Sequence, residues 1–323
     1  MTLDKSNMLK AIEDFPKQCK DAMTLANGIS VSGKINKIII AGMGGSAVGG
    51  DLLKHYMQDS KIPIVTIRDY VLPNYVDENT LVFAVSYSGN TEETLSAFED
   101  AKKKGAKIIA VTSGGKLAAL SKKTIKIPSG LQPRAAVGYL FFPVLGVVAN
   151  MGLAKNADRD AKEMIEVLSS TKEFSDKGMQ IAKNIGNKIP VIYASEQFAV
   201  CAYRWKTQFN ENSKTPAFCH TFSELNHNEI VGYQTMPKDM FHTFFIRDET
   251  DNPRIKKRME ITKDILSTKC SVEEVYTKGK GMLAKLFSAL YYADFASYYL
   301  ALQKKIDPSP VVVIENLKKK LAD

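Results

Sequence analysis

Residues 37–51 read KIIIAGMGGSAVGGD, an apolar run that passes directly into a glycine-rich turn. The run from Lys37 to Gly42 predicts a buried β-strand, and the residues after the turn predict a helix as far as about Met57. Glycine lets the backbone approach a ligand closely, and the unpaired N–H groups at the start of a helix attract an anion. This order of elements indicates an α/β unit with an anion site at the turn.

The alternation of short apolar strands and helices continues through the first half of the chain. A helix is predicted at residues 91–105, where Leu95, Phe98 and Ala101 share one face. The other predicted strands of this half are residues 63–67, 80–86, 107–113 and 123–128. Continuous apolar strands joined by helices indicate a parallel sheet that is covered on both faces.

A similar pattern begins again after a polar helical stretch, residues 156–186, which we interpret as a connector. Its predicted strands are residues 190–195, 241–248 and 271–277, and its predicted helices are residues 198–210, 252–267 and 281–303, followed by a short helix in the tail. We therefore expect an α/β protein with two subdomains, residues 1–153 and 154–323. Each is expected to be a mostly parallel sheet between two layers of helices.

The composition is that of an ordinary globular protein. Of 323 residues, 45% are hydrophobic and 24% are charged, which excludes a disordered or fibrous chain. The net charge of +9 suits a phosphate-bearing partner but does not separate a sugar phosphate from nucleic acid. The four cysteines form no CxxC pair and the N-terminus lacks the apolar core of a signal peptide, so we expect free thiols in a reducing cytoplasm.

The segment from Ala135 to Ala154 carries no charge over 20 residues, which is the length of a membrane span. Pro143, Asn150 and three glycines interrupt it, and the sequence contains no second run of this kind. We therefore predict a helix buried in a soluble core and no membrane partner.

The first glycine turn leaves two classes of ligand open. Gly42, Gly44 and Ala47 nearly complete the GxGxxG pattern of a dinucleotide site, and Asp69 stands where an acidic residue for the ribose is expected. The lysine of a Walker loop is missing. On this motif alone, NAD remains an alternative to a phosphate monoester.

A second turn, SYSGNTEET at residues 86–94, follows another predicted strand and opens another helix. Ser86, Ser88 and Thr91 place three hydroxyls around a tight Gly-Asn turn beside free backbone amides, and such a set suits a monoester phosphate. The alternative is that these hydroxyls only cap the helix. A third hydroxyl-rich turn, residues 112–115, follows the next strand, and ligands of open α/β sheets bind beyond the carboxyl ends of the strands.

Together these turns resemble the sugar isomerase (SIS) domain. Three further stretches resemble the bifunctional phosphoglucose/phosphomannose isomerases of archaea and some bacteria: QPRAAVGY (132–139), WKTQFNENSKTPAF (205–218) and SELNHNEIVGY (223–233). The resemblance covers nearly the whole chain, including the FPKQ of the N-terminal helix. It implies interconversion of glucose 6-phosphate and mannose 6-phosphate with fructose 6-phosphate through a cis-enediolate, without a metal or other cofactor.

The resemblance also implies roles for individual residues. Glu211 is the base, Arg134 stabilises the enediolate, and His227 and Lys318 open the sugar ring. The residues implied to bind the phosphate are Gly45, Ser46, Ser86, Ser88 and Thr91. In related enzymes the histidine comes from the neighbouring subunit, so we expect a homodimer in which His227 acts across the interface.

Two of these residues also have a plainer interpretation from their local sequence. Glu211, between two asparagines, could be a solvated helix end. Arg134, directly before an apolar helix, could be a charge that flanks that helix.

The other two residues are ambiguous as well. His227 could join His220 and Glu224 at a metal ion, although no HxxxH pair or cysteine completes the set. Lys318 shares an apolar stripe with Ile314 and Leu321, which predicts either a lysine with a task on a buried face or one whose stem covers apolar surface.

Two rival functions remain open from the sequence. SIS domains also serve in non-catalytic sugar-phosphate sensors that regulate transcription, but those carry an N-terminal helix-turn-helix module, and the roughly 35 residues before the first strand predict only one helix. An NAD-dependent dehydrogenase is the second rival. Since the sequence holds no recognisable nucleic-acid module, we expect a sugar phosphate and no nucleic acid as the partner.

Overall fold

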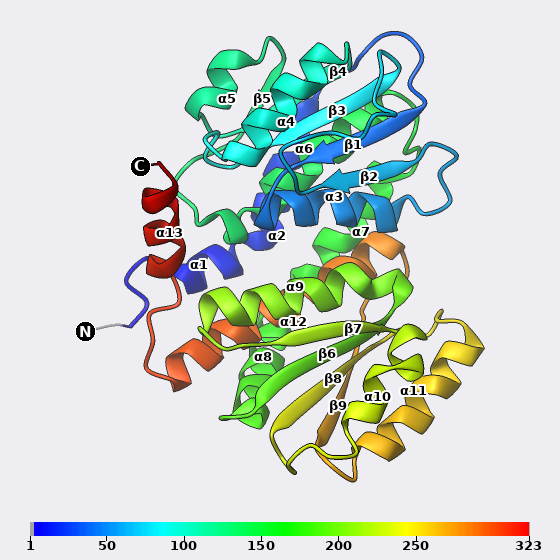
Figure 1. The fold of residues 1–323 in the computed structure, drawn as a ribbon, viewed down its shortest axis with the longest axis vertical. Helices are drawn as coiled ribbons and strands as arrows, with labels where there is room; N and C mark the ends of the chain where they lie inside the picture. Colours follow the sequence, from blue (N-terminus) through cyan, green and yellow to red (C-terminus); the bar gives the residue numbers. More distant parts are fainter. Residues whose placement is uncertain (1–2, 323) are drawn as a thin grey trace. The chain divides into compact units, whose positions relative to one another are not determined.

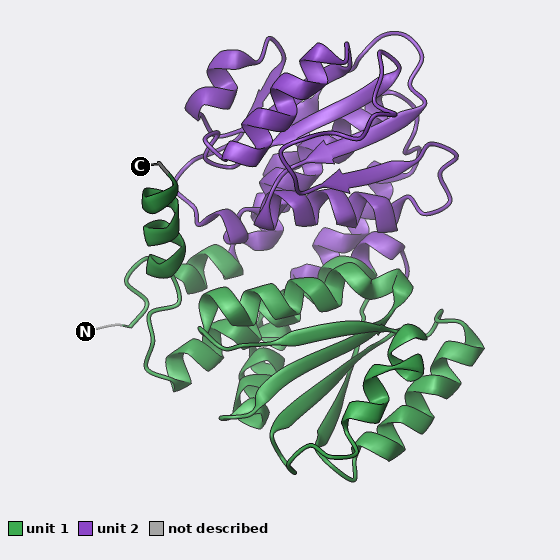
Figure 2. Ribbon diagram, in the orientation of Figure 1, with its two compact units in different colours: residues 1–13, 170–279, 285–323 green, residues 14–169, 280–284 purple. Residues whose placement is uncertain are grey.

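The computed structural model describes residues 3–322, and these residues fold into two compact units (Figure 2). Unit 2 consists of residues 14–169 and 280–284. Unit 1 consists of the described parts of residues 1–13, 170–279 and 285–323. Each unit is built around one sheet.

Unit 2 contains a five-stranded, fully parallel sheet. Its strands, all within the predicted ranges, are β1 (Lys37–Ala41), β2 (Ile64–Ile67), β3 (Thr80–Val85), β4 (Lys107–Thr112) and β5 (Thr124–Lys126). The spatial order is β2-β1-β3-β4-β5, so the chain winds outward from β1 in one direction and from β3 in the other. The neighbouring strands β1 and β3 therefore mark the switch in winding direction.

Helices cover both faces of this sheet (Figure 1). The helices of unit 2 are α2 (Phe15–Met23), α3 (Gly44–Tyr56), α4 (Glu92–Lys103), α5 (Gly115–Leu120), α6 (Val137–Asn150) and α7 (Ala157–Leu168). On one face, Ile39 and Val82 pack with Ala97 of α4. On the other, a Cβ added at Gly50 of α3 would lie 2.8 Å from the Cβ of Ile40. The predicted three-layer arrangement is confirmed for this unit.

The uncharged segment around residue 140 forms a buried helix, as predicted. Most of the 14 residues of α6 are buried, and the helix contacts both α2 and α3. A Cβ added at Gly49 would lie 3.3 Å from the carbonyl oxygen of Leu140, so α3 and α6 approach each other closely there. Throughout residues 3–322, no helix is both long enough and apolar enough to cross a membrane.

The chain leaves unit 2 after Ser169, later than the boundary predicted after residue 153. The helix between these positions, α7, contacts α2 and α6. Its Asp160 also accepts a hydrogen bond from the hydroxyl of Tyr56 at 2.8 Å. These contacts place the start of the predicted connector in unit 2.

Unit 1 has the same architecture around a four-stranded parallel sheet in the order β7-β6-β8-β9. Its strands are β6 (Ile189–Ser195), β7 (Phe218–Phe222), β8 (Phe241–Arg247) and β9 (Ser271–Tyr276). The sequence predicts three of them but not β7. This strand lies at the edge of the sheet and is largely half-buried, with Phe218 53% exposed, so it lacks the continuous apolar burial of a central strand.

Helices again lie on both faces of the sheet (Figure 1). The helices of unit 1 are α1 (Met8–Glu13), α8 (Thr171–Ile185), α9 (Ala199–Asn212), α10 (Glu229–Gly232), α11 (Pro253–Leu266), α12 (Met282–Gln303) and α13 (Val312–Ala322). Trp205 of α9 packs on Phe244 of β8, with ring centroids 5.2 Å apart. On the opposite face, Met259 of α11 packs into a cluster with Tyr193 and Phe245.

Two helical segments are divided where the sequence predicts one. The stretch 156–186 forms α7 and α8, and the single helix expected before β1 is divided into α1 and α2 at Asp14. Pro16 lies in the first turn of α2 and has no N–H to continue the hydrogen-bond ladder of α1. The short helix α5 is also not expected from the sequence.

Candidate active site

The two turns predicted to bind a ligand follow β1 and β3, the strands at the winding switch of unit 2. A Cβ added at Gly42, directly after β1, would lie 2.8 Å from the carbonyl oxygen of Val85 at the end of β3. The backbones of the two turns are therefore in contact, and α3 and α4 begin from them. This is the position at which open α/β sheets bind their ligands.

The turn after β3 is organised by its own hydroxyl groups. Ser86 is 1% exposed, and its Oγ lies 2.8 Å from Oγ1 of Thr91. The same oxygen accepts a hydrogen bond from the amide of Gly89 at 3.1 Å. Ser88 is exposed, and its Oγ accepts from the amide of Asn90 at 3.2 Å. The three predicted phosphate-binding hydroxyls thus belong to one hydrogen-bonded turn.

The hydroxyl-rich turn after β4 supports the Ser86 turn. Ser113 Oγ donates a hydrogen bond to the carbonyl oxygen of Tyr87 at 2.6 Å, and the amide of Leu117 donates to that of Gly89 at 2.9 Å. Gly89 has a φ of +70°, and a Cβ added there would lie 1.8 Å from the carbonyl oxygen of Gly114. Only glycine fits this position, because both the backbone conformation and the close carbonyl exclude a side chain.

The starts of α3 and α4 carry no side-chain cap within the described part of the chain. Met43 occupies the N-cap position of α3. Thr91 occupies that of α4, but its hydroxyl pairs with Ser86 instead of capping the helix. The first amides of both helices therefore lack the partner that a cap would supply, and an anion can take that place. This arrangement argues against the interpretation of Thr91 as an ordinary cap.

Arg134 lies on η2 (Pro133–Ala135), just before α6, and is 3% exposed. A Cβ added at Gly45 of α3 would lie 2.9 Å from the carbonyl oxygen of Pro133 and 3.5 Å from Cα of Arg134. The glycine turn and the Arg134 segment are therefore in backbone contact. A charge that only flanks a helix would normally stay exposed, so this burial favours a more specific role for Arg134.

Gln18 of α2 fixes the segment that carries Arg134. Its Oε1 accepts a hydrogen bond from the amide of Gly138 at 2.8 Å, and its Nε2 donates to the carbonyl oxygen of Ala135 at 2.9 Å. The side chain is 5% exposed. The residues next to Gln18 in the sequence do not indicate this function. Gln18 is noticeable only because it belongs to the FPKQ stretch of the family resemblance.

In unit 1, Glu211 lies half-buried at the end of α9. A row of buried donors, four residues apart on this helix, binds acceptors on α12. These pairs are Arg204 with Asp294 (3.1 Å), Gln208 with Asp294, and Asn212 with Ser297 (2.9 Å). Buried polar groups are costly unless paired, so these pairs favour the observed register of the two helices. The row therefore fixes Glu211 along the axis of α9.

His227 ends the 3₁₀ turn η4 (Glu224–His227) and lies exposed. The neighbouring residues of its motif anchor the loop. Leu225 is 1% exposed in the core cluster beneath it. The side-chain hydrogen bonds are Asn226 to Thr262 (2.8 Å), Asn228 to Glu224 (2.6 Å) and Tyr193 to Glu229 (2.6 Å). The loop is thus held on both sides of an exposed imidazole.

Lys318 lies on α13, and the apolar stripe that it shares is exposed. Leu321 is 65% exposed, and Ile314 is 39% exposed. The prediction that Lys318 lies on a buried face of its helix is therefore wrong for this structure. The periodicity places these residues on one face, as expected, but does not reveal whether that face is covered.

Of the alternatives left open by the sequence, the geometry bears on the metal site. Among residues 3–322, no group of three or more His, Cys, Asp or Glu side chains is arranged to hold a metal ion, and this includes His220, Glu224 and His227.

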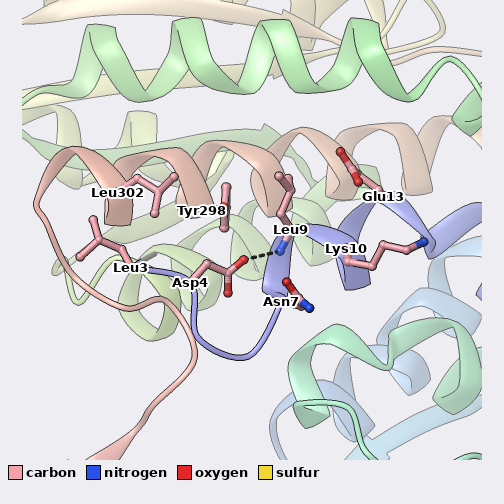
Figure 3. Close-up of a pocket in the computed structure, with 8 residues that line it drawn as sticks. All are labelled: Leu3, Asp4, Asn7, Leu9, Lys10, Glu13, Tyr298 and Leu302. Carbon is pink, nitrogen blue, oxygen red and sulfur yellow. Dashed lines mark hydrogen bonds between the residues drawn. The ribbon is translucent and has the colours of Figure 1, made fainter. Parts of the chain in front are cut away.

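A surface cavity of about 650 Å³ lies between α1 and the end of α12 (Figure 3). It is lined by Leu3, Asp4, Asn7, Leu9, Lys10, Glu13, Tyr298 and Leu302. The Asp4 carboxylate accepts hydrogen bonds from the amides of Met8 and Leu9 and so starts α1. None of the predicted site residues lines this cavity.

Comparison with known proteins agrees with this geometry. Residues 33–142 match the family model of the SIS domain, and residues 174–321 match that of the bacterial phospho-glucose isomerase C-terminal SIS domain. The C-terminal domain of glucosamine-fructose-6-phosphate aminotransferase from Francisella tularensis has the same fold, with a TM-score of 0.73 and 16% identity over 95% of this chain and 98% of that one. The class is therefore that of double SIS-domain proteins.

Full-length relatives narrow the class further. A bifunctional phosphoglucose/phosphomannose isomerase from Caldicellulosiruptor bescii is 46% identical, over 98% of this chain and 99% of the relative. Another, from Thermoplasma acidophilum, is 43% identical over the same shares. The chain belongs to the family of bifunctional phosphoglucose/phosphomannose isomerases.

Proposed function

We propose that this protein is an aldose–ketose isomerase that interconverts glucose 6-phosphate and mannose 6-phosphate with fructose 6-phosphate. The observation that carries the proposal is the contact between the uncapped glycine turn and the buried Arg134 segment in unit 2. This contact brings an anion site for the phosphate next to Arg134, whose positive charge can stabilise the negative charge of an enediolate. The names of the full-length relatives support the same reaction.

The phosphate of the substrate is proposed to bind at the two turns of unit 2. The residues are Gly45, Ser46, Ser86, Ser88 and Thr91. Hydroxyls and backbone amides can surround a monoester phosphate without a fixed cation, and the amides at the start of α3 and α4 add the favourable end of each helix dipole.

In the proposed reaction, His227 and Lys318 exchange protons with the ring oxygen and the C1 hydroxyl, which opens the sugar ring. Glu211 then removes the C2 proton of the aldose, and the electron pair of that C–H bond forms the C1–C2 double bond of a cis-enediolate. Arg134 stabilises the negative charge on the enediolate oxygen. The hydroxyl proton passes from O2 to O1, and return of the proton from Glu211 to C1 gives the ketose, so no oxidant or reductant is consumed.

We also propose that the protein acts as a cytoplasmic homodimer. The exposed position of His227, on a loop whose neighbours are all anchored, suits a residue that serves the active site of a partner subunit. A sugar 6-phosphate is the proposed partner, and no nucleic acid is expected.

The direct test is a coupled assay of fructose 6-phosphate formation from each aldose phosphate. We expect both glucose 6-phosphate and mannose 6-phosphate to be converted, at a rate that a chelator leaves unchanged. Binding of sugar phosphates without turnover would favour the sensor. A requirement for NAD would favour the dehydrogenase, and loss of activity with chelator would indicate a metal enzyme.

The first variant to test is Glu211→Gln, which keeps the size of the side chain but cannot accept the C2 proton. We expect kcat to fall by about 10³-fold or more, because proton transfer by a placed base contributes that order of rate acceleration. Fructose 6-phosphate binding, measured by calorimetry, should change by less than about threefold. Substantial remaining activity would remove Glu211 as the base.

A further inference from the structure

Lys214 lies two residues after the end of α9, and its ammonium group bridges two segments of unit 1. Nζ is 2.8 Å from the carbonyl oxygen of Glu211 and 3.3 Å from that of Asn212, both at the end of α9. It is also 3.2 Å from the carbonyl oxygen of Asp307 and 3.0 Å from that of Pro308. The second pair belongs to the segment that leads into α13.

The backbone of Lys214 has an unusual conformation for a lysine. Its φ is +49°, in the left-handed region that glycine or asparagine normally occupies where a helix ends. A residue with a large side chain is uncommon there, and such a residue points to a task for its side chain. The function visible here is to place a positive charge on the last carbonyl groups of α9, where the helix dipole favours a cation.

The segment on the other side of the ammonium group is also ordered. Asp307 Oδ1 accepts a hydrogen bond from the amide of Ser309 at 2.9 Å, which closes the turn whose carbonyl groups face Lys214. Ser309 is 1% exposed. A second contact joins the same two regions of the chain, because Nζ of Lys304 donates to the hydroxyl of Thr215 at 2.6 Å. The partner of Lys304 is the side chain of Thr215 and not the backbone of Glu211, so Lys304 offers a matched control.

We propose that Lys214 is a positioning residue for the isomerisation, one that fixes the end of α9 against the 307–308 segment and so holds the Glu211 carboxylate at the substrate. This inference rests on the proposed function, in which Glu211 is the base. The helix register set by Asp294 determines where α9 lies along its axis. Lys214 prevents the last turn of that helix from fraying, and charged hydrogen bonds to carbonyl groups are strong enough for this purpose. The base must serve two neighbouring carbon atoms, so small displacements are costly.

The test is Lys214→Met, which keeps the length of the stem but removes every donor. We expect kcat for glucose 6-phosphate to fall by about 10- to 100-fold, the loss caused by a misplacement of about 1 Å. KM should stay within about twofold, because the proposed phosphate contacts all belong to unit 2. With glucose 6-phosphate deuterated at C2, the isotope effect on kcat should be at least as large as that of the wild-type protein, since the slowed step is proton transfer by Glu211.

Two further variants separate positioning from general stability. Lys304→Met removes the neighbouring contact and should lower the melting temperature about as much as Lys214→Met while kcat stays within about twofold. Lys214→Arg keeps a cation near the carbonyl groups and should recover most of the lost kcat.

The outcomes that overturn the inference are equally specific. They are an unchanged kcat in Lys214→Met, an equal loss in Lys304→Met, or an isotope effect smaller than that of the wild-type protein. A wild-type protein without isomerase activity would overturn the proposed function and this inference together. An active wild-type protein with an equally active Lys214→Met variant would overturn this inference alone.

Discussion

Gly45 is required by a contact with its neighbours and not by the conformation of its own backbone. The preceding Gly44 has a φ of +50° and open space where a Cβ would be. Gly45 has no such backbone conformation, but the carbonyl oxygen of Pro133 lies 2.9 Å from its Cβ position. A side chain at this single residue would therefore push apart the predicted phosphate turn and the Arg134 segment.

Gly45→Ala should consequently weaken the binding of the substrate. We expect the dissociation constant of fructose 6-phosphate, measured by calorimetry, to rise about tenfold, which corresponds to about 1.4 kcal/mol. Gly232→Ala is the control, because Gly232 lies in α10 with open space at its Cβ position. Equal affinity in both variants would show that the turn tolerates the displacement.

Among the elements, Glu273 of β9 connects its strand to β8 and α8. Its carboxylate accepts hydrogen bonds from Lys177 (2.8 Å) and Asn184 (3.0 Å) and lies 3.3 Å from Nε2 of His242. Burial disfavours the charged form, but the hydrogen bonds from His242, Asn184 and Lys177 outweigh it and lower the pKa of Glu273 to about 2. The ionised carboxylate therefore stabilises the folded state.

The stability of the protein should depend on pH through this group. Since the pKa of Glu273 is lower in the folded than in the unfolded chain, its contribution is complete above about pH 4.5 and is lost as the pH falls toward 2. Glu273→Gln should lower the free energy of unfolding by about 3 kcal/mol at pH 7. Urea titrations at several pH values should show the two proteins converge below pH 4.5. A constant difference between them would contradict the lowered pKa.

In the whole molecule, the carboxyl ends of the two sheets are used differently. The sheet of unit 2 ends in hydroxyl and glycine turns with uncapped helices. At the corresponding end of the unit 1 sheet, Ser195 donates to the Asp251 carboxylate at 2.5 Å, and Lys285 donates to Asp248 at 2.8 Å. Both aspartates are buried. Unit 1 thus contains its own anions at the position where unit 2 is open to an external one.

The proposed homodimer can be tested by mixing two inactive variants. If His227 serves the partner subunit, a dimer of one Glu211→Gln chain and one His227→Ala chain has one intact active site. Random mixing then restores about a quarter of the wild-type activity per chain, since half of the dimers are mixed and each has one active site. If His227 serves its own chain, the mixture stays inactive.

Much of the fold is predictable because it depends on local patterns. The apolar strands of both sheets, the glycine turn at Gly44 and the buried helix α6 all follow from periodicity and residue type. The edge strand β7 does not, since its half-buried residues give no such pattern. The exposed stripe at Lys318 is a related case, because periodicity identifies a face of a helix but not what covers it.

The candidate site also contains residues that the sequence reveals and residues that it does not. Ser86 and Thr91 are recognisable because the turn and the hydroxyls are adjacent in the chain, and the motifs around Glu211 and His227 are recognisable by resemblance. The residues that hold these side chains in place are not recognisable from the sequence. Gln18, Lys214 and Asp294 act through hydrogen bonds between residues 86 to 120 positions apart, and nothing in their neighbouring residues indicates the partner.

The amino-acid sequence was therefore sufficient for the class of fold, the order of the elements and the family, because strand and helix periodicity and contiguous motifs are local properties of a chain. It was not sufficient for the contact of Gly45 with the Arg134 segment, the register of α9 on α12 or the bridge made by Lys214. Those features exist only once distant segments have packed, since a hydrogen bond depends on distances of a few ångströms that the order of residues does not specify.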